Sequence, residues 1–218
     1  MKPHDFLEAA RVPKSVEPQE FGLWTIERRT LHGPDGPSKF WRELIGPCRW
    51  LDYTILRRWT LASMHLHLGE IVMEDSEREL RRHLPIWLNA RGRVLKTGLG
   101  LGCVVRGLLA NPDVHHVDVV EIDADIIRII GAEFAGNPRV TIHHADALTW
   151  DFGKLRWDYA WHDLHSFDER HLQLMHGDLI TRFLPVVEGD RQAAWAFPRE
   201  VARRLPFQML GAPKRRAA

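Results

Sequence analysis

The stretch Val94–Leu109, VLKTGLGLGCVVRGLL, is the strongest indication of the fold in this sequence. It begins as a short apolar run, carries glycines at every second position in its middle, and ends with the spacing of a helix. A strand that turns through glycines into a helix is typical of nucleotide-binding α/β domains, because glycine permits close backbone approach and the helix N-terminus offers unpaired N–H groups. We therefore expect a ligand to lie against Gly98, Leu99, Gly100 and Gly102.

Strands and helices alternate on the C-terminal side of this loop. The sequence predicts helices over 103–110, 124–134 and 166–183, and strands over 117–122, 140–143, 157–162 and 192–197. Such alternation requires right-handed crossovers and gives a mostly parallel sheet. The predicted fold class is therefore α/β, with a Rossmann-like sheet. Leu205-Pro206 argues against a long sixth strand, so we expect the sheet to be truncated after its fifth strand.

The residues before the loop have a different pattern. Three prolines and few apolar residues predict a loosely ordered arm up to about Gln19. Apolar alternation predicts a strand over 21–31 and a second hairpin over 59–73. Ser76 and Glu79 have the spacing of a capping box, which predicts a short helix after them.

These patterns divide the chain into three parts. We expect an N-terminal arm and hairpin-rich extension over 1–83, which would cover the substrate. A Rossmann-like domain would follow over 84–205, and a basic flexible tail over 206–218.

The composition is that of a globular protein. Of 218 residues, 44% are hydrophobic and 27% charged, enough to bury a core without disulfides. Thirty Lys and Arg nearly cancel 29 Asp and Glu, so the net charge of +1 gives no overall attraction to nucleic acid or membranes. Two cysteines form no disulfide framework, and no apolar run reaches the roughly 18 residues of a membrane span. We expect a cytoplasmic protein without a membrane partner.

Acidic residues after the second and third strands suit a nucleoside. Glu121 lies about twenty residues beyond the loop, where a carboxylate can accept both ribose hydroxyls of NAD or of S-adenosylmethionine (SAM). Even glycine spacing favours SAM, which has no phosphate, over a dinucleotide. Asp146 can accept from an adenine amine while the backbone of Ala147 donates to the ring. Another nucleotide, or a fold that has lost its ligand, are the open alternatives.

Four segments together resemble the class I SAM-dependent methyltransferases, and most of all their spermidine-synthase-like branch: Val94–Leu109, Val119–Asp123, Ala145–Ala147 and Trp157–Asp163. The resemblance covers about Leu66–Phe197 and extends to methyltransferase-like proteins of bacteria and phages. It implies a Rossmann-like sheet, SAM as the cofactor at the carboxyl ends of the strands, and often a homodimer. It also implies that the cofactor segment continues from Glu121 through Ile122 and Asp123.

Three positions depart from the family pattern. Leu101 and Ser166 stand where aminopropyltransferases carry aspartates. A polyamine needs carboxylates to offset its desolvation, so their loss argues against spermidine synthesis. Lys96 stands where many methyltransferases have an acid that contacts the amino-acid end of the cofactor. A lysine would repel the ammonium there but could pair with the carboxylate.

Asp163 and His162 are the candidate catalytic residues. They end the fourth strand, where an open parallel sheet usually places catalytic groups, and could take a proton from the nucleophile. Neighbouring strand residues point to opposite faces, so only one should face the ligand. The resemblance favours Asp163; the alternative is that Asp163 caps the following turn.

Histidines and tryptophans are frequent, with 13 and 9 copies. Two clusters raise a metal hypothesis. His65-x-His67 lacks a third ligand nearby in the sequence, and His162, Asp163 and His165 could form a facial triad only if the loop folds back, so we expect no metal. The tryptophans form either an aromatic substrate pocket or packing between the extension and the sheet, and packing is favoured.

The leading functional hypothesis is a SAM-dependent methyltransferase acting on a small-molecule substrate. No Asn-Pro-Pro-Tyr-like sequence follows the fourth strand, and no stripe of basic and aromatic residues is present, which argues against nucleic acid as a partner. The alternatives are a spermidine-synthase-like enzyme acting on the aminopropyl part of SAM, by transfer, cleavage or cyclisation, and a SAM-binding protein without turnover.

Overall fold

The computed structural model describes residues 1–30, 52–60, 69–165 and 169–195. Five strands form a parallel sheet in the order β7-β6-β5-β8-β9. Their bounds are β5 (Gly92–Thr97), β6 (Val114–Glu121), β7 (Val140–His144), β8 (Tyr159–His162) and β9 (Gln192–Ala194). The first strand of the domain is therefore central, and the chain order reverses beside it. This arrangement confirms the predicted Rossmann-like α/β fold.

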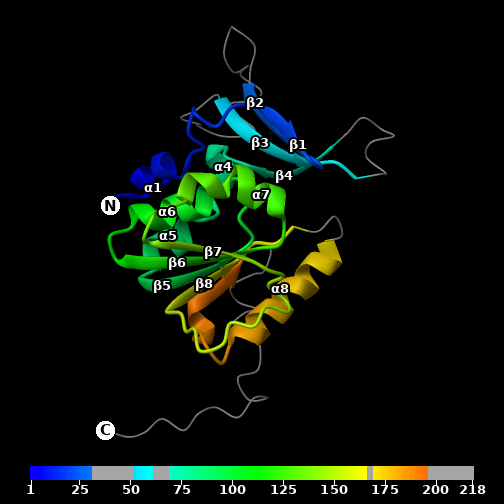
Figure 1. Cartoon of the computed structure of the whole chain (residues 1–218). Coiled ribbons are helices and arrows are strands. Elements are labelled where there is room, and N and C mark those ends of the chain that lie inside the picture. Colours follow the sequence, from blue (N-terminus) through cyan, green and yellow to red (C-terminus); the bar gives the residue numbers. More distant parts are fainter. Residues whose placement is uncertain (31–51, 61–68, 166–168, 196–218) are drawn as a thin grey trace, which may run out of the picture.

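Helices cover both faces of this sheet, as Figure 1 shows. One face carries α5 (Leu84–Asn89), α6 (Cys103–Ala110) and α7 (Ala124–Ile129), which continues into a 3-10 turn over Gly131–Phe134. The opposite face carries α8 (Glu169–Phe183). The predicted helix 124–134 thus consists of two pieces, and β6 begins three residues earlier than expected. The Asp123 side chain caps the N-terminus of α7.

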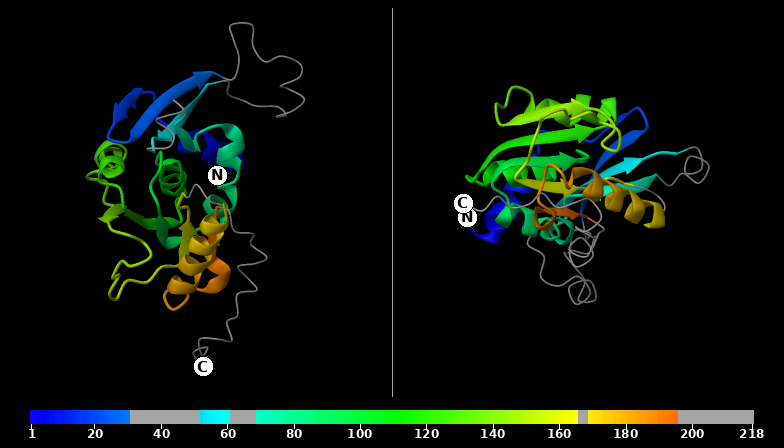
Figure 2. Two further views of the ribbon diagram at one scale, coloured as in Figure 1. Left: turned by 90° about the vertical axis from the view of Figure 1, so that its right-hand side faces the viewer. Right: turned by 90° about the horizontal axis from the view of Figure 1, so that it is seen from below.

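A smaller antiparallel sheet lies above the parallel one, with α6 and α7 between them (Figures 1 and 2). Its strands run in sequence order: β1 (Gln19–Phe21), β2 (Trp24–Thr30), β3 (Asp52–Arg58) and β4 (Glu70–Glu74). The second hairpin was expected over 59–73, but the strand that pairs with β4 lies earlier, over 52–58. The short helix α4 (Glu77–Arg81) follows, with its N-terminus capped by the Ser76 hydroxyl.

The expectation of a loosely ordered N-terminal arm is wrong. Residues Pro3–Ala10 form helix α1, whose apolar side is buried against α5 and α6. Phe6 stacks on Trp87 with ring centroids 6.4 Å apart, and Arg106 donates to the carbonyl of Ala10. The prolines misled the prediction, because proline is favourable in the first turn of a helix.

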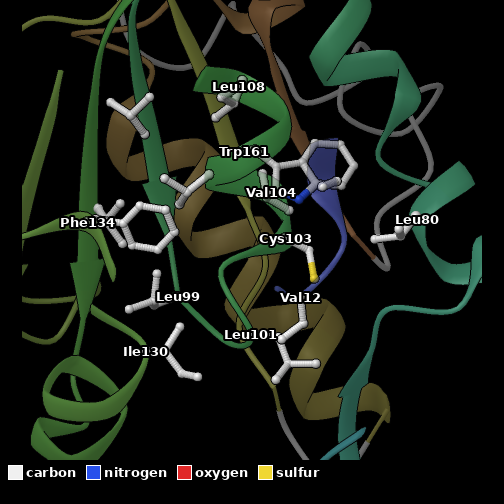
Figure 3. Packing of buried hydrophobic residues seen from close by; sticks show 14 of the residues in the cluster. Val12, Leu80, Leu99, Leu101, Cys103, Val104, Leu108, Ile130, Phe134 and Trp161 are labelled. Carbon is white, nitrogen blue, oxygen red and sulfur yellow. The ribbon is translucent and has the colours of Figure 1, made fainter. Parts of the chain in front are cut away.

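Two leucine side chains of the glycine loop are buried in the core and hold the loop in place. Leu99 and Leu101 are almost fully buried and pack among Ile130, Phe134 and Cys103, as Figure 3 shows. The glycines alternate with these leucines, which leaves the glycine backbone on the outer side of the turn. The core therefore fixes the loop at the strand ends. Among the described residues, no helix is long and apolar enough to cross a membrane.

Candidate active site at the carboxyl ends of the parallel strands

The glycine loop allows close approach by two neighbouring elements. Gly98 and Gly100 have φ values of +78° and +55°, which other residues rarely adopt. A Cβ on Gly98 would lie 2.3 Å from the carbonyl oxygen of Asp163, and one on Gly100 would lie 2.7 Å from the sulfur of Met73. The loop is thus enclosed between the end of β8 and strand β4.

Glu121 holds this loop through its carboxylate. Its Oε2 accepts from the backbone N–H of Leu99 at 2.6 Å, and its Oε1 accepts from that of Asp123 at 2.9 Å. The side chain is buried at the end of β6. A carboxylate oxygen can accept more than one hydrogen bond, so both oxygens retain capacity for hydroxyl donors. Glu121 therefore stands beside the glycine loop with both carboxylate oxygens able to accept further hydrogen bonds.

An exposed apolar side chain and a second carboxylate flank Glu121. Ile122 is 63% exposed, an unusual state for isoleucine. Asp146 follows β7, which pairs with β6, and its Oδ1 accepts from the backbone of Leu148. The next side chain, Ala147, is buried. Ile122 thus offers a flat apolar surface, and Asp146 an acceptor, at the ends of adjacent strands.

Asp123 has a structural role in the chain, and its place in the cofactor segment stays a prediction. Its Oδ1 accepts from the backbone of Asp125 and Ile126, and its Oδ2 accepts from the indole of Trp24 at 2.9 Å. Both oxygens are engaged by the chain itself. Asp123 therefore caps α7 and anchors the small sheet to the parallel one, which is the packing role favoured for the tryptophans.

Lys96 is buried and pairs with Asp163. Its Nζ lies 3.3 Å from Asp163 Oδ2 and donates to the carbonyls of Thr97 and Gly98. Burial lowers the pKa of Lys96, which Asp163 opposes. Burial alone would raise the pKa of Asp163, but the Lys96 ammonium holds it below its usual value. Lys96 could have paired with the carboxylate of a ligand, but in the structure its ammonium pairs with Asp163 instead. Asp163 stays ionised as a result.

His162 is withdrawn from the site, so its assignment as a catalytic residue is not retained. It is fully buried on the α8 side of the sheet, where its ring nitrogens lie 3.2 Å from Thr97 Oγ1 and from Gln192 Oε1. Burial lowers its pKa to about 3. The alternation of side chains along β8 explains this placement, because Trp161 and Asp163 point to the opposite side.

Residues from the segment before the glycine loop also contribute to the site, and the sequence did not predict them. His83, between α4 and α5, is fully buried and packs against Trp161. Glu79 accepts from the indole of Trp195. Together with Asp163, these side chains line one cleft. The capping box identified Glu79 only as a helix residue, and nothing in the spacing of His83 indicated a site.

Met73 of β4 covers the loop from above. Its sulfur accepts from the backbone N–H of Leu101 at 3.3 Å and sits over Gly100. A thioether is a weak hydrogen-bond acceptor, so a carboxylate would bind the Leu101 N–H more strongly than the Met73 sulfur does. Of the other sequence candidates, Ser166, His65 and His67 lie outside the described residues. Within the described part of the chain, no three His, Cys, Asp or Glu side chains converge as metal ligands.

Two kinds of curated relative match parts of the chain. Ribosomal RNA small subunit methyltransferase A of Pseudomonas syringae pv. tomato is 41% identical over 63 residues, covering 29% of this chain and 23% of the relative. Polyamine aminopropyltransferase of Streptococcus uberis is 30% identical over 140 residues, covering 58% and 48%. The chain thus spans about a quarter and about half of their lengths. No family model matches the chain.

Solved methyltransferases have a similar sheet. The 23S rRNA methyltransferase ErmE has a TM-score of 0.39 at 20% identity, covering 50% of this chain and 41% of that one.

Three findings support the same family: the sheet order, the carboxylate of Glu121 beside the glycine loop, and the matched relatives. We assign the chain to the class I methyltransferase superfamily. The cofactor of such a methyltransferase is SAM. The residues fit it: Glu121 retains acceptor capacity toward a ribose, Ile122 offers exposed apolar surface, and Leu101 has an N–H held only by a sulfur.

The comparisons also correct the expectation about partners. A small-molecule substrate was expected and nucleic acid was argued against, whereas the matched methyltransferases are named as ribosomal RNA enzymes. That expectation is wrong because all three observations behind it were indirect. The net charge, the absent motif after β8 and the absent stripe of basic and aromatic residues do not report which acceptor a methyltransferase takes.

Proposed function

We propose that the chain is a SAM-dependent methyltransferase. The observation that carries the proposal is the carboxylate of Glu121, which is hydrogen-bonded to the backbone of Leu99 and of Asp123. The loop that contains Leu99 follows β5 and borders the switch point of the sheet, where the strand order reverses between β5 and β8. Ligands of open α/β sheets bind at this point. The exposed Ile122 lies beside it.

Each part of the cofactor has a proposed partner in the chain. Glu121 would accept from the ribose hydroxyls, while Ile122 and Asp146 would contact the adenine. The backbone of Gly98–Gly102 would bind the methionine portion, with the Leu101 N–H exchanging the Met73 sulfur for the carboxylate. When bound, SAM supplies an electrophilic methyl group. The residues of the chain would hold cofactor and acceptor in line, which is the main requirement of methyl transfer.

Asp163 is proposed to face the acceptor as an ionised carboxylate. Its position after β8 and beside Gly98 supports this role. Lys96 keeps the carboxylate charged, so Asp163 would accept a hydrogen bond from the acceptor and orient it. A carboxylate with a lowered pKa is a weak base, which favours positioning over proton removal.

We propose RNA as the acceptor, which the ribosomal RNA methyltransferases among the relatives support. The small sheet and α4 would form the cover over the acceptor, since β4 and α4 supply Met73 and Glu79 to the cleft. This retains the division into a covering part over 1–83 and a Rossmann-like domain from residue 84.

The test is transfer of labelled methyl from SAM by the full chain to total RNA, to protein and to a small-molecule extract. We expect label in RNA together with S-adenosylhomocysteine (SAH). Label in another fraction would refute the RNA acceptor but keep the methyltransferase. Methylthioadenosine formed without methylation would instead favour the aminopropyl alternative, which the match to a polyamine aminopropyltransferase supports.

A further inference from the structure

Buried polar atoms without partners gather next to the proposed cofactor site. Within the described part of the chain, neither ring nitrogen of His83 has a hydrogen-bond partner, although the side chain is fully buried. The indole nitrogen of Trp161 is also buried and unpartnered, and its ring meets that of His83 at a centroid distance of 5.5 Å. Native proteins rarely leave such groups unsatisfied, so their clustering points to a ligand.

His83 belongs to a cleft with apolar walls, and Trp161 packs against the His83 ring without lining that cleft itself. His83 lines it together with Met73, Leu164 and Trp195, while Glu79 and Asp163 contribute carboxylates. Gly100 of the glycine loop also borders the cleft, so whatever occupies it lies next to the methionine portion of the proposed cofactor.

The charges around the cleft cancel. Asp163 is paired with Lys96 at 3.3 Å, and Glu79 with Arg82 at 3.3 Å. Burial lowers the pKa of His83 to about 4, which Lys96 and Arg82 reinforce and Asp163 opposes, so the imidazole is neutral near pH 7. An ion placed here would have no free countercharge and would lose its hydration. The cleft therefore suits an uncharged occupant.

We propose that this cleft is the acceptor subsite, and that it takes an uncharged, planar group that donates an N–H or O–H to a ring nitrogen of His83. A neutral imidazole has one nitrogen that accepts and one that donates, which complements such a group. The amino group on a nucleobase ring has this chemistry. The inference rests on the proposed function in calling the occupant the methyl acceptor.

Entry requires one wall of the cleft to move, because His83 is closed to solvent. Trp195 is 36% exposed, and its contacts at the cleft are a hydrogen bond to Glu79 and stacking beneath Arg82. Displacing this ring would break one hydrogen bond and open the path to His83.

The test uses phenol, toluene and benzylammonium as probes of similar size on the full chain with labelled imidazole nitrogens, followed by NMR with and without SAH. Loss of a signal in His83→Gln assigns His83. Trp161→Phe gives a second assignment, because removal of the adjacent indole changes the ring current at His83. His165→Gln is the matched control on the exposed side of the same cleft.

We expect phenol to shift the His83 signals saturably, and toluene and benzylammonium to bind at least tenfold more weakly. The proposal is overturned if phenol leaves His83 unchanged, or if toluene or benzylammonium shifts it as strongly as phenol. SAH binding is measured in the same samples. Absence of SAH binding would overturn the proposed function, whereas SAH binding without a phenol response would overturn the subsite alone.

Discussion

The Nζ of Lys96 lies 3.3 Å from the Oδ2 of Asp163, which joins the end of the central strand to the end of its neighbour. Lys96 is 1% exposed and Asp163 19%. Many members of the family have an acid at the position of Lys96, so this chain reverses the charge there and balances it internally. The pair fixes the positions of the glycine loop and of the proposed acceptor-facing carboxylate relative to each other.

Breaking this pair from one side should destabilise the fold. Lys96→Met leaves the carboxylate of Asp163 without its partner, and we expect the free energy of unfolding in urea to fall by about 3 kcal/mol. Lys96→Met combined with Asp163→Leu removes both charges and should recover most of that loss. A double variant no more stable than the single one would show that the pair is not coupled.

Buried histidines should make the fold sensitive to acid. Burial lowers the pKa of His83 to about 4 and of His162 to about 3, from 6.5. The unfolded chain therefore binds more protons than the native one, so their contribution to stability is complete above pH 6.5 and is lost as the pH falls toward these values. Each histidine should contribute up to about 1.4 kcal/mol per pH unit.

Urea unfolding at pH 7, 6 and 5 measures this slope. His162→Gln should flatten it by roughly one proton. Equal slopes for wild type and His162→Gln would mean that His162 does not titrate below its usual range.

Met73 should compete with the cofactor for the glycine loop. Its sulfur accepts from the Leu101 N–H, so Met73→Ala frees that donor for a ligand carboxylate. A net hydrogen bond is worth about 0.5–1.5 kcal/mol, and we expect SAH to bind roughly 2- to 10-fold more tightly in calorimetry. Val72→Ala, the neighbouring change in the same strand, should have no such effect. Weaker binding in Met73→Ala would indicate that Met73 supports the site.

The parallel sheet could be predicted from the sequence because each of its elements is marked by neighbouring residues. Glycines after a short apolar strand mark the start of the following helix within a few residues, and the alternation of strands and helices beyond it indicates a parallel sheet. The positions of Glu121 and Asp146 could be predicted for the same reason. Both lie at the carboxyl ends of parallel strands, and these ends share one edge of the sheet.

The remainder of the site depends on contacts between distant segments. His83 meets Trp161 across 78 positions, and Glu79 meets Trp195 across 116, which no local pattern encodes. His162 and Asp163 were correctly expected to point to opposite faces, but only packing against α8 shows that His162 is enclosed. The packing of Phe6 on Trp87, which holds helix α1 in place, could not be predicted either, because it joins segments about 80 residues apart in the sequence.

Calorimetric titration of the full chain with SAH measures whether the glycine loop and Glu121 form a cofactor site. We predict binding at one site, and a loss of about 1.5–3 kcal/mol, or roughly 10- to 150-fold in affinity, in Glu121→Ala, because charge-assisted hydrogen bonds are removed. Glu121→Gln, which keeps an oxygen for the Leu99 N–H, should lose less. Unchanged affinity in Glu121→Ala would contradict the ribose assignment, and no binding of SAH or SAM by the wild-type chain would contradict the account as a whole.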